Sequence, residues 1–111
     1  MRLMVMKGPK TFSGTRQAVI LTGAIHGNEY LHLEDRIPNA LIEAARVKGP
    51  VSQFIARGGV FIFVPIINPD GYDLRKRGNA KGENLNRDWP IPSAGNEGFT
   101  QPETVSLNAE I

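Results

Sequence analysis

The chain has 111 residues, of which 41% are hydrophobic and 22% are charged, and these values fit one small globular domain. Its net charge of +2 does not suggest a nucleic-acid-binding protein, and the absence of cysteine excludes disulfides and thiolate metal sites. No stretch approaches the ~20 apolar residues that cross a membrane, and the N-terminal segment lacks the apolar core of a signal peptide. We therefore expect a cytoplasmic protein with no nucleic-acid partner and no membrane partner.

The first half of the chain carries a strand signal followed by a helix signal. Residues 2–6 predict a short edge strand, and residues 17–25 form a nearly continuous apolar run that is typical of a buried, parallel strand. A helical pattern follows over residues 30–47. Pro38 interrupts this pattern, so either two short helices meet there or the main helix starts near this proline. One more helical turn is predicted over residues 51–56.

The second strong strand signal lies at residues 60–64, which are all β-branched or aromatic. Two buried strands with a helix between them predict a βαβ unit, in which the strands are parallel. The sequence NPDG at residues 68–71 then predicts a turn at the end of the second strand. No periodicity is clear from 73 to 101, and a helix is predicted to start near Pro102 with Thr100 as its cap.

The sequence HGNE at residues 26–29 follows the first strong strand directly, with glycine at positions 23 and 27. Ligand sites of open α/β sheets lie beyond the carboxyl ends of parallel strands, so HGNE and NPDGY are expected at the same edge. His26 and Glu29 supply an imidazole nitrogen and a carboxylate, which are both zinc ligands. This spacing alone is a weak pattern, and a tight turn that carries polar residues is the alternative interpretation.

Basic residues are concentrated in a short segment that follows the second strand. The acids in this segment, Asp73 and Glu83, offset only part of the charge. Such a cluster indicates anion recognition, unless it is a solvated, charged loop. The basic cluster comprises Arg75, Lys76, Arg77, Lys81 and Arg87.

The segment RGNAKGENLNRDW at residues 77–89 completes an ordered set of three motifs, HGNE, NPDGY and R-x-N-x-x-G-x-x-L-N-R. With this set the chain resembles the zinc carboxypeptidase family, the metallocarboxypeptidases of the funnelin type, from about Gln17 to Thr104. The resemblance implies an α/β fold. In that fold, residues 1–111 would form the N-terminal part of a three-layer αβα catalytic domain with a central, mostly parallel or mixed sheet.

The resemblance also implies an activity, zinc-dependent hydrolysis of a C-terminal peptide bond with one zinc ion as cofactor. His26 and Glu29 would bind the zinc ion, which activates the attacking water and polarises the carbonyl. Arg77 would polarise the scissile carbonyl and stabilise the oxyanion. Asn86 and Arg87 would hold the free carboxylate of a peptide or small amide substrate, since a guanidinium fork matches a planar carboxylate.

Two features depart from the family pattern. Asn84 stands where many members have an aspartate that orients the zinc-binding histidine, and Asp88 or Asp70 would be the alternative partners of that ring. The family's third zinc ligand, a histidine, and its glutamate general base have no counterpart in these 111 residues. His32, the second histidine, is interpreted as a surface or packing residue. We therefore expect this chain alone to be inactive.

Two alternative functions remain open. The first is an N-acyl amino acid hydrolase similar to succinylglutamate desuccinylase and aspartoacylase, which share a similar HGNE sequence and an Asn-Arg pair. The second is a non-catalytic, truncated module. The NPDGY turn and the R-x-N-x-x-G spacing favour the peptidase.

Overall fold

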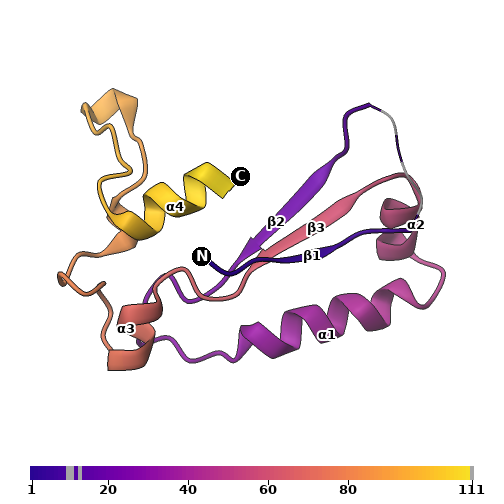
Figure 1. Cartoon of the computed structure of the whole chain (residues 1–111), viewed down its shortest axis with the longest axis horizontal. Helices are drawn as coiled ribbons and strands as arrows, with labels where there is room; N and C mark the ends of the chain where they lie inside the picture. The colour runs from indigo at the N-terminus through magenta and orange to yellow at the C-terminus, as the bar shows by residue number, and fades with distance from the viewer. Residues whose placement is uncertain (10–11, 13, 111) are drawn as a thin grey trace. The chain divides into compact units, whose positions relative to one another are not determined.

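The computed structural model describes residues 1–9, 12 and 14–110, which form two compact units (Figure 1). Arg2–Leu21 and His32–Pro65 form the first, which we call the sheet unit. Met1, Thr22–Leu31 and Ile66–Ile111 form the second, which we call the motif unit because it contains all three sequence motifs.

The sheet has three strands in the order β1-β3-β2. Strand β1 (Met4–Met6) runs antiparallel to β3 (Val60–Val64), with Val5 opposite Ile62. Strand β2 (Ala18–Thr22) is parallel to β3, because residue numbers rise together along the backbone hydrogen bonds at the two ends of the pair. These bonds are Val60 N to Gln17 O at 2.9 Å, Ile67 N to Gly23 O at 3.0 Å and Asn68 N to Ala24 O at 3.1 Å. The mixed sheet and the helices confirm the predicted α/β class, the parallel pair and the short edge strand.

Burial differs sharply between the two strands that the sequence predicts to be buried. Strand β3 is central, and its residues Phe63 and Val64 are 3% and 0% exposed. Strand β2 lies at the edge, and its residues Val19 and Ile20 are 39% and 41% exposed. The prediction of a buried strand over residues 17–25 is therefore wrong for this chain, because within the described part of the chain β2 has a hydrogen-bonded strand on one side only.

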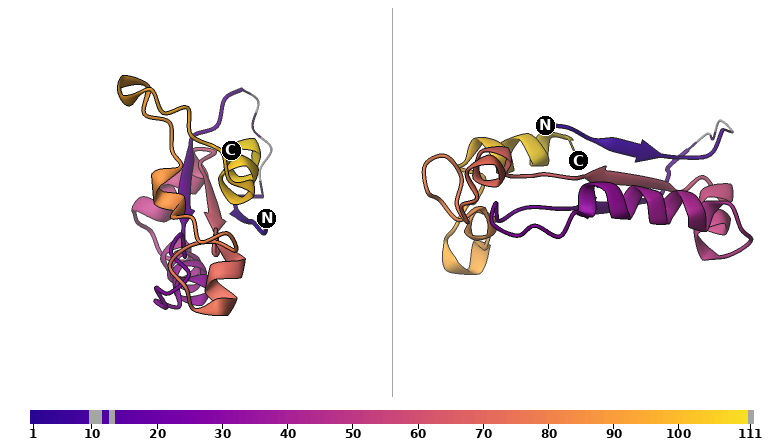
Figure 2. Two further views of the ribbon diagram at one scale, coloured as in Figure 1. Left: turned by 90° about the vertical axis from the view of Figure 1, so that its left-hand side faces the viewer. Right: turned by 90° about the horizontal axis from the view of Figure 1, so that it is seen from below.

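Helix α1 spans Leu33–Ala45 without a break, so neither alternative for Pro38 is correct. Pro38 is the sixth residue of the helix, and its missing amide affects only one bond to the first turn. Helix α2 (Pro50–Ala56) corresponds to the predicted helical turn, and its Phe54 packs edge-on against Phe61 of β3 at 5.1 Å between ring centroids. Figure 2 shows α1 running along one face of the strands.

The motif unit contains short elements joined by loops. Helix α3 (Pro69–Leu74) occupies the position of the predicted NPDG turn, because the Asn68 side chain caps it by accepting a 2.9 Å hydrogen bond from the Gly71 amide. Two 3-10 helices follow, η1 (Leu85–Arg87) and η2 (Pro92–Ala94). Helix α4 (Pro102–Glu110) begins where the sequence predicts a helix start.

Ile67, Leu85 and Leu107 are each at most 3% exposed and form the apolar core of the motif unit. Among the described residues, no helix has the length and apolar content needed to cross a membrane.

Candidate metal and substrate site

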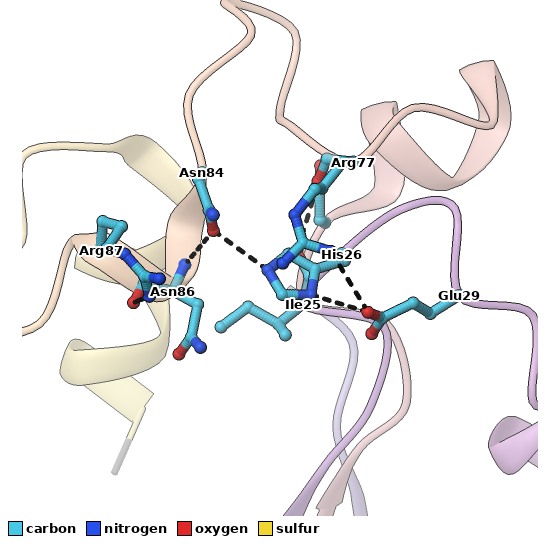
Figure 3. A network of polar contacts seen from close by, with 8 residues as sticks. Ile25, His26, Glu29, Arg77, Asn84, Asn86 and Arg87 are labelled. Atoms are coloured by element: carbon cyan, nitrogen blue, oxygen red, sulfur yellow. Dashed lines mark hydrogen bonds and ion pairs between the residues drawn. The ribbon is translucent and has the colours of Figure 1, made fainter.

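The HGNE sequence forms a turn immediately beyond strand β2. Ala24 has a positive φ of 49°, which redirects the backbone after the strand. The Glu29 amide then donates to the His26 carbonyl at 3.2 Å and closes the turn. The helix that the sequence predicts from residue 30 begins only at Leu33, so His26 and Glu29 lie on a turn and not at a helix start. The turn brings His26 Nδ1 to 3.0 Å from Glu29 Oε1 (Figure 3).

The second nitrogen of the His26 ring faces Asn84. Asn84 Oδ1 lies 3.0 Å from His26 Nε2 and also accepts a 3.0 Å hydrogen bond from the Asn86 amide. The backbone donor fixes the oxygen of the carboxamide at this position, so Nε2 of His26 carries the hydrogen and donates it. In a neutral ring, Nδ1 then presents a lone pair toward the Glu29 carboxylate. Two electron-pair donors that face each other in this way require a cation between them, either a proton or a metal ion.

The site lies at the boundary between buried and exposed side chains. His26 is 6% exposed, whereas the side chains of Glu29 and Arg77 are 49% and 53% exposed. Arg77 Nη1 is 3.5 Å from Glu29 Oε1, so the carboxylate interacts with the imidazole and the guanidinium together (Figure 3). The His26 ring is contacted at both of its nitrogens, while the two charged groups remain exposed to solvent.

The His26–Glu29 pair is compatible with zinc. Two ligands of one tetrahedral zinc ion, each about 2.0–2.1 Å from the metal, stand about 3.4 Å apart. The observed 3.0 Å between His26 Nδ1 and Glu29 Oε1 needs only a small adjustment to reach this spacing. Within residues 1–9, 12 and 14–110, no three His, Cys, Asp or Glu side chains converge, so His26 and Glu29 have no third potential metal ligand beside them.

Asn86 and Arg87 lie on η1 and are exposed. Asn86 Oδ1 accepts a 3.1 Å hydrogen bond from Trp89 Nε1, which fixes the orientation of the carboxamide. Arg87 Nη1 donates to the Asn86 carbonyl at 3.1 Å. In the view of Figure 3, Asn84 and Asn86 lie between Arg87 and the His26–Glu29 pair. The structure thus joins four side chains by hydrogen bonds, those of His26, Glu29, Arg77 and Asn84, and leaves Arg87 turned back on its own segment.

Asp88 is not a partner of His26, contrary to one of the alternatives that the sequence left open. Its buried carboxylate binds the beginning of α4. Burial raises the pKa of Asp88, but hydrogen bonds from the side chains of Thr104 and Thr100 and from two backbone amides lower it by more. The net effect is a pKa of about 2, below the ordinary value. Asp70, the other alternative, is exposed in the first turn of α3. The donors to Asp88 are the Thr100 amide and hydroxyl, the Gln101 amide and the Thr104 hydroxyl.

Asn79 is a buried residue of the third motif to which sequence reasoning gave no role. It is 4% exposed, and its Oδ1 accepts hydrogen bonds from the amides of Lys81 and Glu83 at 3.0 and 2.9 Å. Its Nδ2 donates to Gln101 and Glu103 at 2.9 and 3.2 Å. Asn79 therefore closes its own loop and ties it to the start of α4. An asparagine between glycines in a loop was the available signal, since asparagine side chains often bond to the nearby backbone.

The remaining polar residues singled out in the sequence are solvated. The side chain of His32 is 63% exposed and lies 3.5 Å from Glu34 at the start of α1, which fits its interpretation as a surface residue. Arg75 is exposed, and its guanidinium stacks 5.3 Å from the centroid of the Tyr30 ring. Lys76 and Lys81 are also exposed. Of the basic cluster, Arg77 is the member that reaches the His26–Glu29 pair.

Comparison with known proteins identifies a matching family and two carboxypeptidase relatives. Residues 2–109 match the family described as zinc carboxypeptidase. Carboxypeptidase SOL1 of Arabidopsis thaliana is 34% identical over 90 residues, and Cytosolic carboxypeptidase 6 of Caenorhabditis elegans is 31% identical over 86 residues. Each alignment covers 77% of this chain and 18% of the relative, so the chain spans less than a fifth of the length of these proteins.

Solved structures show the same fold. A candidate carboxypeptidase from Burkholderia mallei superimposes with a TM-score of 0.66 at 26% identity, over 98% of this chain and 27% of that protein. An aspartoacylase family protein from Mesorhizobium loti superimposes with a TM-score of 0.52 at 25% identity, over 98% of this chain and 30% of that protein. The family match covers nearly the whole sequence and includes all three motifs, so this chain belongs to the zinc carboxypeptidase family.

Proposed function

We propose that this chain forms part of the active site of a metallocarboxypeptidase, which hydrolyses a C-terminal peptide or amide bond with one zinc ion. The observation that carries the proposal is the 3.0 Å approach of His26 Nδ1 to Glu29 Oε1, with Asn84 on the opposite nitrogen of the ring. Membership of the zinc carboxypeptidase family supports it. The substrate class is a peptide or small amide with a free carboxylate.

His26 and Glu29 are the proposed metal ligands. His26 would bind through Nδ1, because Asn84 keeps the hydrogen on Nε2 and holds the ring in place. Glu29 would bind through the oxygen that already faces the ring. When bound there, zinc would supply activation of a water molecule and polarisation of the scissile carbonyl.

Arg77 is the proposed oxyanion-stabilising residue. Its guanidinium lies 3.5 Å from Glu29 Oε1, next to the proposed metal position. A fixed cation aimed at the developing negative charge stabilises the transition state more than the ground state. Arg77 would therefore act mainly on kcat.

Asn86 and Arg87 are the proposed clamp for the substrate carboxylate. The Arg87 guanidinium has five N–H donors, of which one bond to the Asn86 carbonyl uses a single group. Its fork can therefore still offer two parallel hydrogen bonds to a carboxylate. The carboxamide of Asn86, oriented by Trp89, would add a further donor.

We further propose that this chain has no peptidase activity by itself. A zinc ion with only two protein ligands is under-coordinated, and among the described residues no third His, Cys, Asp or Glu side chain joins the His26–Glu29 pair to complete the site. A cytoplasmic location is also proposed, with the name of Cytosolic carboxypeptidase 6 of Caenorhabditis elegans as its support. Hydrolysis of C-terminal peptide substrates by the purified chain, lost on chelation, would contradict the proposed inactivity.

Zinc binding by the chain tests the metal ligands directly. Competition with a chromophoric chelator should give weak but measurable binding, which His26→Ala or Glu29→Gln abolishes. His32→Ala is the matched control, because its side chain is 63% exposed and lies outside the motif unit. Equal zinc affinity in the unsubstituted chain and in His26→Ala would refute the assignment of the ligands.

The proposed clamp is tested in an enzyme that carries this chain together with the rest of a carboxypeptidase domain. Arg87→Lys keeps the charge but replaces a fork by a single donor group. The loss of one charge-assisted bond, worth roughly 1.5–3 kcal/mol, lowers kcat/KM by about ten- to a hundredfold on substrates with a free terminus. Substrates with an amidated terminus should be poor for both forms and show little further loss. Equal losses on the two substrate types would show that Arg87 is structural.

The alternative activity is hydrolysis of N-acyl amino acids. The structural likeness to the aspartoacylase family protein of Mesorhizobium loti favours it. A panel of C-terminal peptides and N-acyl amino acids, assayed with the same enzyme, separates the two activities. A non-catalytic module, the remaining alternative, would show neither activity and would bind no zinc at the His26–Glu29 pair.

A further inference from the structure

The three motifs meet at a junction where backbone packs directly on backbone. A Cβ at Gly27 would lie 2.0 Å from the Gly71 carbonyl carbon and 2.4 Å from the Lys76 oxygen, so the HGNE turn rests on α3 and on the segment before Arg77. The Gly27 amide also faces the Arg77 carbonyl at 3.4 Å. Such an approach permits no side chain between the motifs.

Asn68 lies at the centre of this junction and is 0% exposed. Its Oδ1 accepts from the Gly71 amide at 2.9 Å. Its Nδ2 donates to the Gly78 carbonyl at 3.1 Å and to the Ile25 carbonyl at 3.3 Å, and it lies 3.5 Å from the Arg77 carbonyl. One carboxamide thus contacts the backbone of its own motif, of the third motif and of Ile25, the residue directly before HGNE.

We propose that Asn68 is a positioning residue that sets the spacing between the His26–Glu29 pair and Arg77. Ile25 directly precedes His26, and Gly78 directly follows Arg77, so the same NH2 group holds the peptide on one side of each functional residue. Any change in these two hydrogen bonds moves His26 relative to Arg77. What the two positioned residues do rests on the proposed function, whereas the link itself does not.

The chemistry of the link requires a carboxamide. Both acceptors are carbonyls, and the Asn68 side chain that reaches them is fully buried, so the residue must offer two donors on one atom and also an acceptor to the Gly71 amide. Aspartate supplies the acceptor without the donors. Serine is a good helix cap, but its single hydroxyl is too short to reach the same carbonyls.

This difference allows the capping role to be separated from the linking role. Asn68→Asp keeps an acceptor for the Gly71 amide and removes both donors to Ile25 and Gly78. Asn68→Ser keeps a capping group and adds no charge. Asn108→Asp makes the same chemical change on the exposed side of α4 and serves as the matched control.

Two measurements on this chain test the proposal, under conditions where circular dichroism shows that each variant is folded. Chelator competition should show that Asn68→Asp and Asn68→Ser weaken zinc binding about tenfold or more, while Asn108→Asp binds as the unsubstituted chain does. In both variants, hydrogen exchange at the Gly27 amide, which depends on the link, should accelerate relative to the unsubstituted chain. This acceleration should exceed that at the capped Gly71 amide by about tenfold or more. Zinc affinity and Gly27 exchange within twofold of the unsubstituted chain in both folded variants would overturn the proposal.

A third measurement needs no variant and decides the matter if neither variant folds. The side-chain amide protons of Asn68 should exchange about a hundredfold more slowly than those of the exposed Asn108, and equal rates would overturn the proposal. If the unsubstituted chain binds no zinc, the proposed metal site fails, and the exchange rates alone then decide the role of Asn68.

Discussion

Replacing Asp88 by asparagine should remove the group that anchors the start of helix α4. Oδ2 of Asp88 accepts from the Gln101 amide at 2.9 Å and from the Thr104 hydroxyl, and Oδ1 accepts from the Thr100 hydroxyl at 2.7 Å. Asparagine keeps one acceptor but turns an NH2 group toward donors. Because the side chain is only 8% exposed, water cannot take over the lost hydrogen bonds.

The size of the effect follows from the pKa of Asp88, which is lowered from 3.8 to about 2. A shift of this size corresponds to about 2 kcal/mol of folding free energy that is contributed by the ionised form. The folded-state pKa lies below the unfolded value, so this contribution is complete above pH 3.8 and is lost as the pH falls through about 2. Donors left facing the NH2 group cost about 1–3 kcal/mol. We therefore expect Asp88→Asn to lower the free energy of unfolding by about 2–4 kcal/mol at pH 7.

Urea unfolding followed by far-UV circular dichroism measures this difference. The gap between Asp88→Asn and the unsubstituted chain should shrink by about 2 kcal/mol between pH 7 and pH 2, since protonation removes the advantage of the carboxylate. Glu97→Gln, a similar change at an exposed acid of the same segment, should alter stability by less than about 0.5 kcal/mol. A gap below 0.5 kcal/mol at pH 7, or one that stays constant down to pH 2, would refute the reasoning.

Three further substitutions test other parts of the motif unit, including the proposed zinc site. Gly27→Ala places a Cβ 2.0 Å from a backbone carbon and should lower the free energy of unfolding, measured in urea, by about 3 kcal/mol or more. Gly49→Ala, with open space around the new Cβ, should lower it by less than about 1 kcal/mol, and similar losses in the two variants would contradict the close backbone packing at Gly27. Ala24→Gly relieves a φ of 49° and should raise the free energy of unfolding by up to about 1 kcal/mol, so a clear loss would show that its methyl group matters more than its backbone angle. Asn84→Asp should tighten zinc binding to the chain about tenfold in chelator competition, because a carboxylate on His26 Nε2 strengthens the ring as a ligand, and unchanged affinity would contradict this.

The parts of the fold that the sequence predicts well are those that local chemistry determines. The run of β-branched and aromatic residues at 60–64 predicts strand β3, and the spacing of HGNE predicts that two side chains approach each other. Zinc binding by His26 and Glu29 and substrate binding by Asn86 and Arg87 stay predictions. The order of the three motifs was sufficient to indicate the family, because each motif places specific polar groups on the same set of loops.

Two of the failures, at strand β2 and at the cap of α4, share a different cause, which is dependence on neighbours far along the chain. An apolar run such as residues 17–25 reads as buried, yet the exposure of Val19 and Ile20 depends on what lies beside β2 in space. The cap of α4 is similar. The sequence favours Thr100 because it is local, whereas the carboxylate that binds the helix start belongs to Asp88, outside the reach of any local pattern. Pro38 is tolerated because its position in the helix falls near the first turn.

The way in which the motif unit is held together has a consequence for how the site can vary. Apolar core residues in this unit are few, and the segments that carry His26, Arg77 and Asn84 are held mainly by hydrogen bonds and by glycine-mediated backbone contact. Hydrogen bonds fix direction as well as distance, whereas apolar contacts tolerate sliding. A site held in this way should lose metal affinity on substitution of Asn68 or Gly27 before it loses its helices. An exposed apolar residue such as Ile20 can change with little effect on the site. Residues of the three motifs should therefore tolerate substitution poorly, and exposed residues outside the motifs should tolerate it well.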